Sequence, residues 1–129
     1  MTPDLTYLAL SAVLCLFLWW PHVNARALII GPAKAAGYPD QEPDMPKWIS
    51  RGARAHANMI ENLPAFAALV LVAHVGGVAN DMTALGAAIF FWGKLAHAII
   101  HILGIPYART AAFFVAWLGM ITIAWQILI

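Results

Sequence analysis

The sequence predicts an all-α integral membrane protein whose 129 residues form one four-helix bundle. Composition is the first reason, because 63% of the residues are hydrophobic and only 10% are charged, against about 25% charged in an ordinary soluble domain. The second reason is that four apolar stretches, each near the roughly 20 residues that a membrane-spanning helix requires, are separated by helix breakers. The third reason is the lack of the many alternating strands that a membrane barrel would need.

A single membrane domain over residues 1–129 is therefore expected, with helices at about residues 4–25, 46–75, 80–103 and 107–129. Asp44 is expected to cap the second helix, and Asn80 or Asp81 the third, because these side chains accept hydrogen bonds from free amides of a first helical turn. Pro106 separates the third helix from the fourth. The short connections after the second and third helices make those neighbours antiparallel.

The distribution of basic residues predicts the orientation in the membrane. The second connection and both termini have no lysine or arginine. Six of these basic residues lie in or beside the first and third connections: Arg26, Lys34, Lys47, Arg51, Arg54 and Arg109. The positive-inside rule then places the first and third connections in the cytoplasm and both termini outside. A net charge of +1 without a basic run gives no reason to expect a nucleic-acid partner.

Two polar stripes interrupt the apolar helices. On the second helix, Arg51, Arg54, Asn58 and Glu61 fall within an arc of roughly 80° at helical pitch. Charged groups in hydrocarbon cost about 2.5–3.5 kcal/mol each on insertion scales, so they are kept only when paired, turned inward or functional. These side chains are therefore candidates for an interior network or a binding site.

The second stripe lies on the third helix, where Lys94, His97 and His101 share an arc of about 60°. Arg109 follows just after the break at Pro106. Glu61 and Lys94 both lie at the middle of antiparallel neighbouring helices, which predicts an ion pair between them.

The residues alone leave four interpretations of these stripes open. One is a polar network that only fixes helix register. A second is a metal site at His97 and His101, which are spaced i, i+4. Glu61 is the only further candidate ligand, and the nearby cations would repel a metal. No metal is therefore expected. A third is an ion or proton path through an oligomeric transporter. The fourth is a cytoplasmic anion pocket lined by arginines, whose forked guanidinium suits carboxylates.

The stretch Arg54-Ala-His-Ala-Asn58-x-x-Glu61, followed by Pro64-x-Phe66, resembles the second-helix signature of the MAPEG family, the membrane-associated proteins in eicosanoid and glutathione metabolism. The length, the four apolar segments and the Pro-rich first connection match as well, and the chain is similar to bacterial members. The resemblance implies a homotrimer in the bacterial inner membrane, with glutathione bound as co-substrate between neighbouring subunits near the cytoplasmic side.

The resemblance also implies roles for individual residues. Arg109 would be catalytic, stabilising the glutathione thiolate, and a guanidinium beside a thiol does lower its pKa from about 8.5. Residues at matching positions would bind the tripeptide: Arg26, Arg54, Asn58, Glu61, His97 and His101. The implied activity is that of a glutathione transferase or peroxidase acting on small lipophilic electrophiles or hydroperoxides.

Some positions depart from the family pattern. Lys94 stands where many members have arginine, His101 and Phe113 stand where tyrosine is frequent, and Ala57 replaces an arginine of some glutathione-using members. These substitutions favour a rival from a different class, a non-catalytic membrane scaffold or accessory subunit with the same fold.

Overall fold

A computed structural model describes all residues from Met1 to Ile129 and contains helices and no strand. The helices are α1 (Pro3–Ile30), α2 (Pro32–Ala36), α3 (Lys47–Val75), α4 (Asp81–Leu103) and α5 (Ala108–Leu128). All except the short α2 are long and apolar enough to cross a membrane. The predicted four-helix membrane fold is therefore confirmed.

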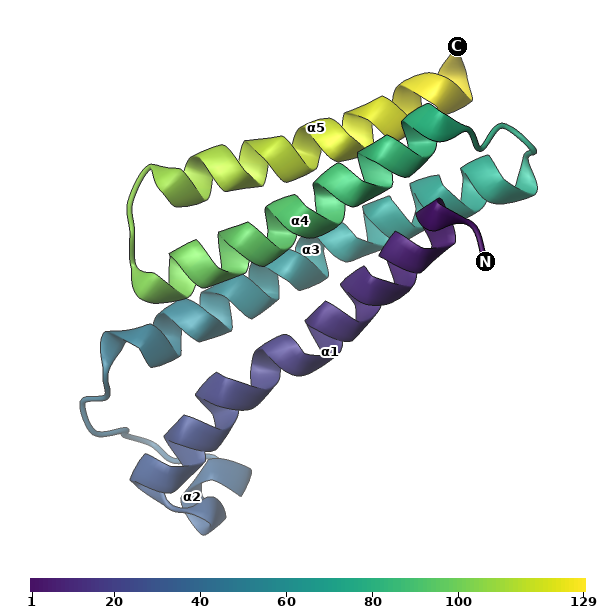
Figure 1. Cartoon of the computed structure of the whole chain (residues 1–129). Coiled ribbons are helices and arrows are strands. Elements are labelled where there is room, and N and C mark those ends of the chain that lie inside the picture. Colours follow the sequence, from purple (N-terminus) through teal and green to yellow (C-terminus); the bar gives the residue numbers. More distant parts are fainter.

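The four long helices alternate in direction along the chain (Figure 1). Helix α4 packs against α1, α3 and α5, whereas α1 and α5 make no contact with each other. Half of the most apolar window of α4 is buried within the chain, against 22% or less in the other three long helices. Helix α4 is therefore the central helix, and a polar residue on its inner face is shielded from lipid by protein.

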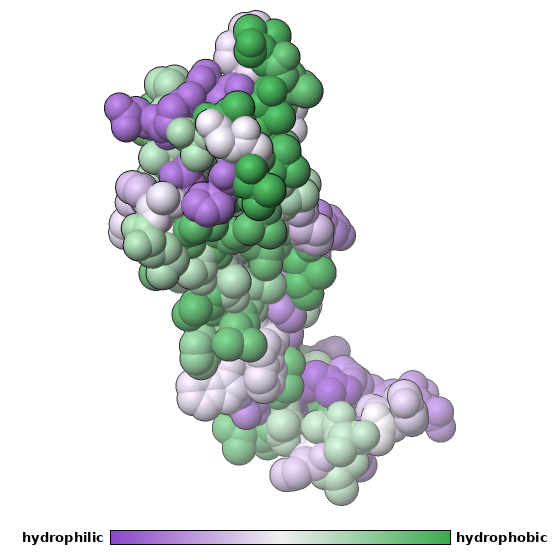
Figure 2. All heavy atoms as spheres, turned by 90° about the vertical axis from the view of Figure 1, so that its right-hand side faces the viewer, coloured by the Kyte–Doolittle hydropathy of each residue, from purple (hydrophilic) through white to green (hydrophobic).

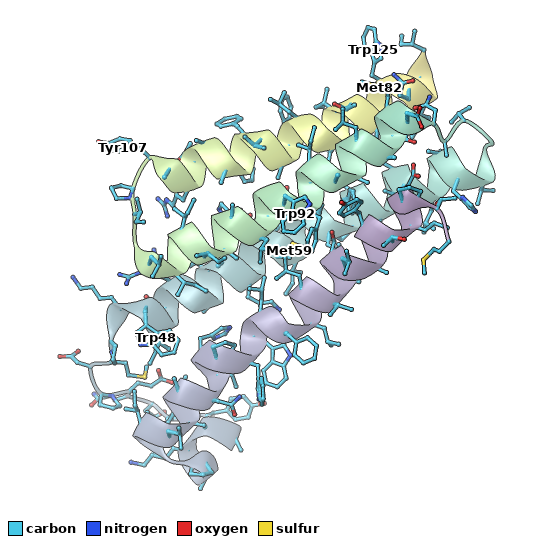
Figure 3. The ribbon with its side chains drawn as sticks, in the orientation of Figure 1. Trp48, Met59, Met82, Trp92, Tyr107 and Trp125 are labelled. Atoms are coloured by element: carbon cyan, nitrogen blue, oxygen red, sulfur yellow. The ribbon has the colours of Figure 1, made fainter.

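The connections between α1 and α3 and between α4 and α5 lie at one end of the bundle, and both termini lie at the other (Figure 1). We call the first of these the basic end, because it carries every lysine and arginine of the chain except Lys94: Arg26, Lys34, Lys47, Arg51, Arg54 and Arg109. Figure 2 shows hydrophobic side chains over much of the bundle and frequent hydrophilic ones in the region of α2. Aromatic side chains mark both ends, with Trp48 and Tyr107 at the basic end and Trp125 at the other (Figure 3). This distribution is that of a bundle with lipid around its middle and water at its ends.

The helix boundaries differ from prediction at two points. Helix α1 continues to Ile30, beyond the predicted end at residue 25, and the side chain of Asn24 donates to the Trp20 carbonyl within the helix at 2.8 Å. The helix ends at Gly31, whose φ of 92° is a backbone conformation open to glycine and strained for other residues. The predicted cap at Asp44 is wrong, because Pro46 is the residue that precedes α3 and no side chain caps that helix.

The end opposite the basic end is joined by hydrogen bonds around Asn80, the predicted cap. Its side chain accepts from the amides of Met82 and Thr83, and the Thr83 hydroxyl accepts from the Asn80 amide, which completes a capping box. The same hydroxyl bonds the buried Asp4 carboxylate at 2.6 Å, and Asn80 donates to Gln126 at 2.8 Å. These bonds connect the start of α4 with α1 and α5.

The apolar core lies where α3, α4 and α5 meet. The rings of Phe66 and Phe90 stack at its centre, with centroids 3.8 Å apart. Seven further buried residues complete it: Met59, Val70, Ala73, Ala87, Ala116, Met120 and Ile123. This core fixes the positions of α3, α4 and α5 and thus of the polar side chains that they carry toward the basic end.

Helices α4 and α5 touch backbone to backbone, and this contact depends on glycine. A Cβ added at Gly119 would lie 2.6 Å from the Gly86 carbonyl oxygen and 2.8 Å from the Phe90 amide, and one at Gly93 would lie 2.9 Å from the Ala116 amide. No side-chain rotation can relieve a clash with backbone atoms, so the two helices would have to separate.

We therefore expect Gly119→Ala to lower the free energy of unfolding by about 1–3 kcal/mol, the usual effect of overpacking a tight core. Thermal melting of the detergent-solubilised protein measures this change. Gly37→Ala is the matched control, because its added Cβ would meet only backbone oxygens at 3.4 Å or more. Equal melting of the two variants would show that the contact between α4 and α5 is not close.

Candidate functional site

The polar stripe of α3 is only partly turned toward the protein. Arg51 and Asn58 are half-buried, whereas Arg54 and Glu61 are exposed. Arg54 reaches the Ser50 hydroxyl at 3.5 Å, and the Asn62 side chain donates to the Asn58 carbonyl at 2.7 Å. The half-buried members face α4, and the exposed members face out of the single chain.

The polar stripe of α4 is buried throughout. Lys94, His97 and His101 are exposed by only 2%, 4% and 7%. The two imidazole rings lie edge to face with centroids 5.5 Å apart, and the Lys94 ammonium lies 5.6 Å from the centre of the Phe113 ring. The central helix thus presents three nitrogen-bearing side chains to the interior of the bundle.

The predicted ion pair between Glu61 and Lys94 is not formed in the single chain. The Lys94 ammonium donates instead to the side-chain oxygen of Asn58, and the structure contains one ion pair only, between Arg26 and Glu42. The reason is helix rotation. Three residues beyond Asn58, Glu61 is turned by about 60° at helical pitch, which carries it away from α4 to the exposed side.

The turn between α4 and α5 positions Arg109. Helix α4 ends at Gly104, which has a φ of 77°. The Gly104 amide donates to the His101 carbonyl, and the Ile105 amide donates to the Ile100 carbonyl. Tyr107 then takes a φ of 65°, which is uncommon outside glycine, and α5 begins directly after it. This tight reversal returns the chain so that Arg109 lies beside the last turn of α4.

Arg109 and His101 are in direct contact. The Nη1 atom of Arg109 lies 3.2 Å from the Nε2 atom of His101. A guanidinium has donors and no acceptor, so His101 accepts at Nε2 and carries its proton on Nδ1. The contact holds the guanidinium beside the last residue of the polar stripe of α4, at the basic end.

A cavity of about 200 Å³ lies between these side chains. Its wall is formed by residues of α3, α4 and α5: Asn58, His97, His101, Arg109, Thr110 and Phe113. It therefore brings together four of the residues selected from the sequence. Thr110 was not predicted, and its position directly after Arg109 is the only feature of the sequence that could have drawn attention to it.

Three residues selected for the tripeptide lie outside this cavity. Arg54 and Glu61 are exposed on α3, and neither borders the cavity. Arg26 lies in a separate cavity of about 380 Å³ between the end of α1 and the start of α3. There its Nε atom donates to Glu42 at 2.8 Å, and this hydrogen bond lowers the pKa of the Glu42 carboxyl.

The charges of the basic end favour an anionic ligand. Arg51, Arg54 and Arg109 form no ion pair with any carboxylate of the chain. A forked guanidinium without a partner at the wall of a cavity is suited to a carboxylate, a phosphate or a thiolate. The positive charge of these arginines is therefore complementary to an anionic ligand.

Comparison with known proteins gives a family for this fold and site. No curated protein gives a significant match to the chain. The family model for the MAPEG family matches residues 5–129, which is nearly the whole chain. The chain therefore belongs to the MAPEG family.

Proposed function

We propose that the protein is a glutathione-dependent transferase or peroxidase of the membrane, acting on small lipophilic electrophiles or hydroperoxides. The observation that carries this proposal is the Arg109 guanidinium, which has no carboxylate partner and lies on a polar cavity with Asn58 and two buried imidazoles. Such a group stabilises a thiolate, because a cation beside a thiol lowers its pKa from about 8.5 toward neutrality.

Two reactions are assigned to this site, a transferase reaction and a peroxidase reaction. In the transferase reaction, the thiol loses its proton to water. The thiolate then forms a carbon–sulfur bond with the electrophile, and the leaving group departs with the electron pair of its own bond. In the peroxidase reaction, the sulfur attacks the terminal oxygen of the hydroperoxide and the O–O bond breaks. The products are a sulfenic acid and an alcohol. A second glutathione then converts the sulfenic acid to a disulfide and water. Arg109 acts in both reactions by stabilising negative charge on sulfur.

We further propose that a homotrimer completes the site. The exposed Arg54 and Glu61 support this, because neither forms an ion pair in the single chain and charged side chains beside lipid are normally paired or turned toward protein. Arg26 pairs with Glu42 in the single chain and would exchange that partner for the tripeptide. In the trimer these side chains would reach glutathione held between neighbouring subunits. The basic end would face the cytoplasm, the orientation that the positive-inside rule favours, and we place the protein in a bacterial inner membrane.

Titration calorimetry of glutathione into the purified, detergent-solubilised protein tests the proposal. We expect saturable binding in the micromolar to millimolar range, and binding to the folded protein should also raise its melting temperature. Ophthalmic acid, which lacks the thiol, is the matched ligand: it should bind the peptide site without the thiolate absorbance that glutathione gains.

The absence of binding at millimolar glutathione would favour the non-catalytic scaffold. One observation supports that rival. Lys94 already occupies the side-chain oxygen of Asn58, so an amide expected to hold the peptide is partly engaged within the chain. Binding of glutathione without turnover of any electrophile or hydroperoxide would favour the scaffold as well.

A further inference from the structure

A third cavity, of about 190 Å³, lies at the basic end at the turn between α4 and α5. It shares Arg109 and His101 with the cavity beside Asn58 and is otherwise lined by different residues: Arg51, Gly104, Ile105 and Pro106. Its most prominent feature is a pair of guanidinium groups, from Arg51 and Arg109. The proposed glutathione chemistry uses Arg109 and His101 but assigns no role to Arg51 or to the other residues of this cavity.

Arg51 is held in place by the backbone of α4. Its Nε atom donates to the Ile102 carbonyl at 2.9 Å, across the last turn of that helix. Its guanidinium lies against Gly104 so closely that a Cβ at that position would be 2.9 Å from the Arg51 Cζ atom. The terminal Nη atoms make no hydrogen bond and no ion pair. Arg51 is thus a fixed cation with free donors at the wall of the cavity.

Arg109 brings the first turn of α5 to the cavity. Its amide has no backbone acceptor, and no side chain caps this helix. The start of a helix carries a partial positive charge, and free amides there bind anions. The α5 terminus and the two guanidiniums therefore favour the same kind of ligand.

His101 holds one of the two guanidiniums in place. It lines this cavity, and its Nε2 atom lies 3.2 Å from the Nη1 atom of Arg109. Its Nδ1 atom is buried away from the cavity without a hydrogen-bond partner, so it offers no donor to a ligand. The cavity therefore holds two positioned cations that lack a counter-ion.

We propose that this third cavity, at the turn between α4 and α5, binds a phosphate group. Two forked guanidiniums and the free amide of Arg109 supply more donors than the two oxygens of a carboxylate can use, whereas a phosphate offers three or more oxygens. The net charge of the two arginines also balances a phosphate. The group can come from the headgroup of an anionic phospholipid, because the cavity lies near the end of the membrane-spanning segments, or from a free phosphate in solution. This inference shares Arg109 with the proposed glutathione site, but its test follows phosphate binding and Arg51, so that it can fail or hold whatever the outcome for glutathione.

The test uses the full-length protein in detergent and two probes. Sodium phosphate is titrated by calorimetry against sodium chloride of equal ionic strength, and dioleoylphosphatidylglycerol is titrated against dioleoylglycerol, which lacks the phosphate. We expect saturable binding of at least one phosphate-bearing probe and a higher melting temperature in its presence.

Arg51→Gln is the decisive variant, because glutamine keeps a donor for the Ile102 carbonyl and loses the charge. It should weaken phosphate binding at least about tenfold, the effect of losing a charge-assisted hydrogen bond. Lys34→Gln removes one charge from α2 at the same end, outside the cavity, and should leave binding unchanged. Arg51→Lys keeps the charge without the fork and should fall between wild type and Arg51→Gln.

The outcomes separate the two sources. Binding of inorganic phosphate that depends on Arg51 supports a site for a free anion. Binding of phosphatidylglycerol alone, dependent on Arg51 and absent with dioleoylglycerol, supports a headgroup site. Lack of binding of both phosphate-bearing probes to the wild-type protein overturns the proposal, and so does binding that Arg51→Gln and Lys34→Gln weaken equally.

Discussion

Arg109→Gln is expected to lower glutathione-dependent turnover at neutral pH by about 10²-fold, the loss typical of removing one preorganised group that stabilises developing charge. On the proposed function, the Arg109 guanidinium keeps the bound thiol ionised. Without it, the thiol pKa returns toward about 8.5, and only a few per cent of the sulfur is thiolate at pH 7. The ultraviolet absorbance of the thiolate, followed against pH in wild type and variant, measures this change directly.

The pH dependence separates this role from simple damage to the site. Activity of the variant should recover as the pH rises toward 9, because the thiol then ionises unaided, whereas a misfolded variant would stay inactive at every pH. Arg109→Lys is the matched control, since it keeps the charge and loses the forked geometry, and it should retain more thiolate than Arg109→Gln. Thiolate absorbance that is unchanged in Arg109→Gln would assign the activation to another group.

The fold could be predicted from the sequence because its determinants are local. Apolar stretches of sufficient length gave the four long helices, and Asn80 was recognised as a cap because its chemistry acts within one turn. The end of α1 was missed because Asn24 bonds back into its own helix, so that a polar residue did not act as a breaker. The short α2 was missed because the helical pattern of five residues is too short to stand out.

The candidate site was predictable where it depends on one helix and one turn. His97 and His101 share a face through helical spacing, and the tight reversal after Gly104 brings Arg109 to them. The pairing of Lys94 was not predictable, because it depends on the rotation of α3 about its axis relative to α4, which the core around Phe66 and Phe90 fixes. No local pattern of the sequence gives that angle.

The second large effect is expected from Asn58→Leu, which leaves the size of the side chain nearly unchanged and removes the oxygen that accepts from Lys94. Lys94 is only 2% exposed, so its ammonium would lose its one hydrogen-bond partner in a buried position. We expect the free energy of unfolding to fall by about 3 kcal/mol, in the range for an uncompensated buried charge. Thermal melting in detergent at neutral pH measures the loss.

A double-mutant cycle shows whether the loss comes from the stranded ammonium. Lys94→Met in the Asn58→Leu background removes the charge and keeps an apolar chain of similar length, so most of the lost stability should return. Glu61→Gln should cost less than Asn58→Leu, because Glu61 is exposed and does not pair with Lys94 in the structure. The opposite order of these two costs would mean that α3 turns Glu61 toward α4 in the assembled protein, and that the ion pair expected from the sequence forms there after all.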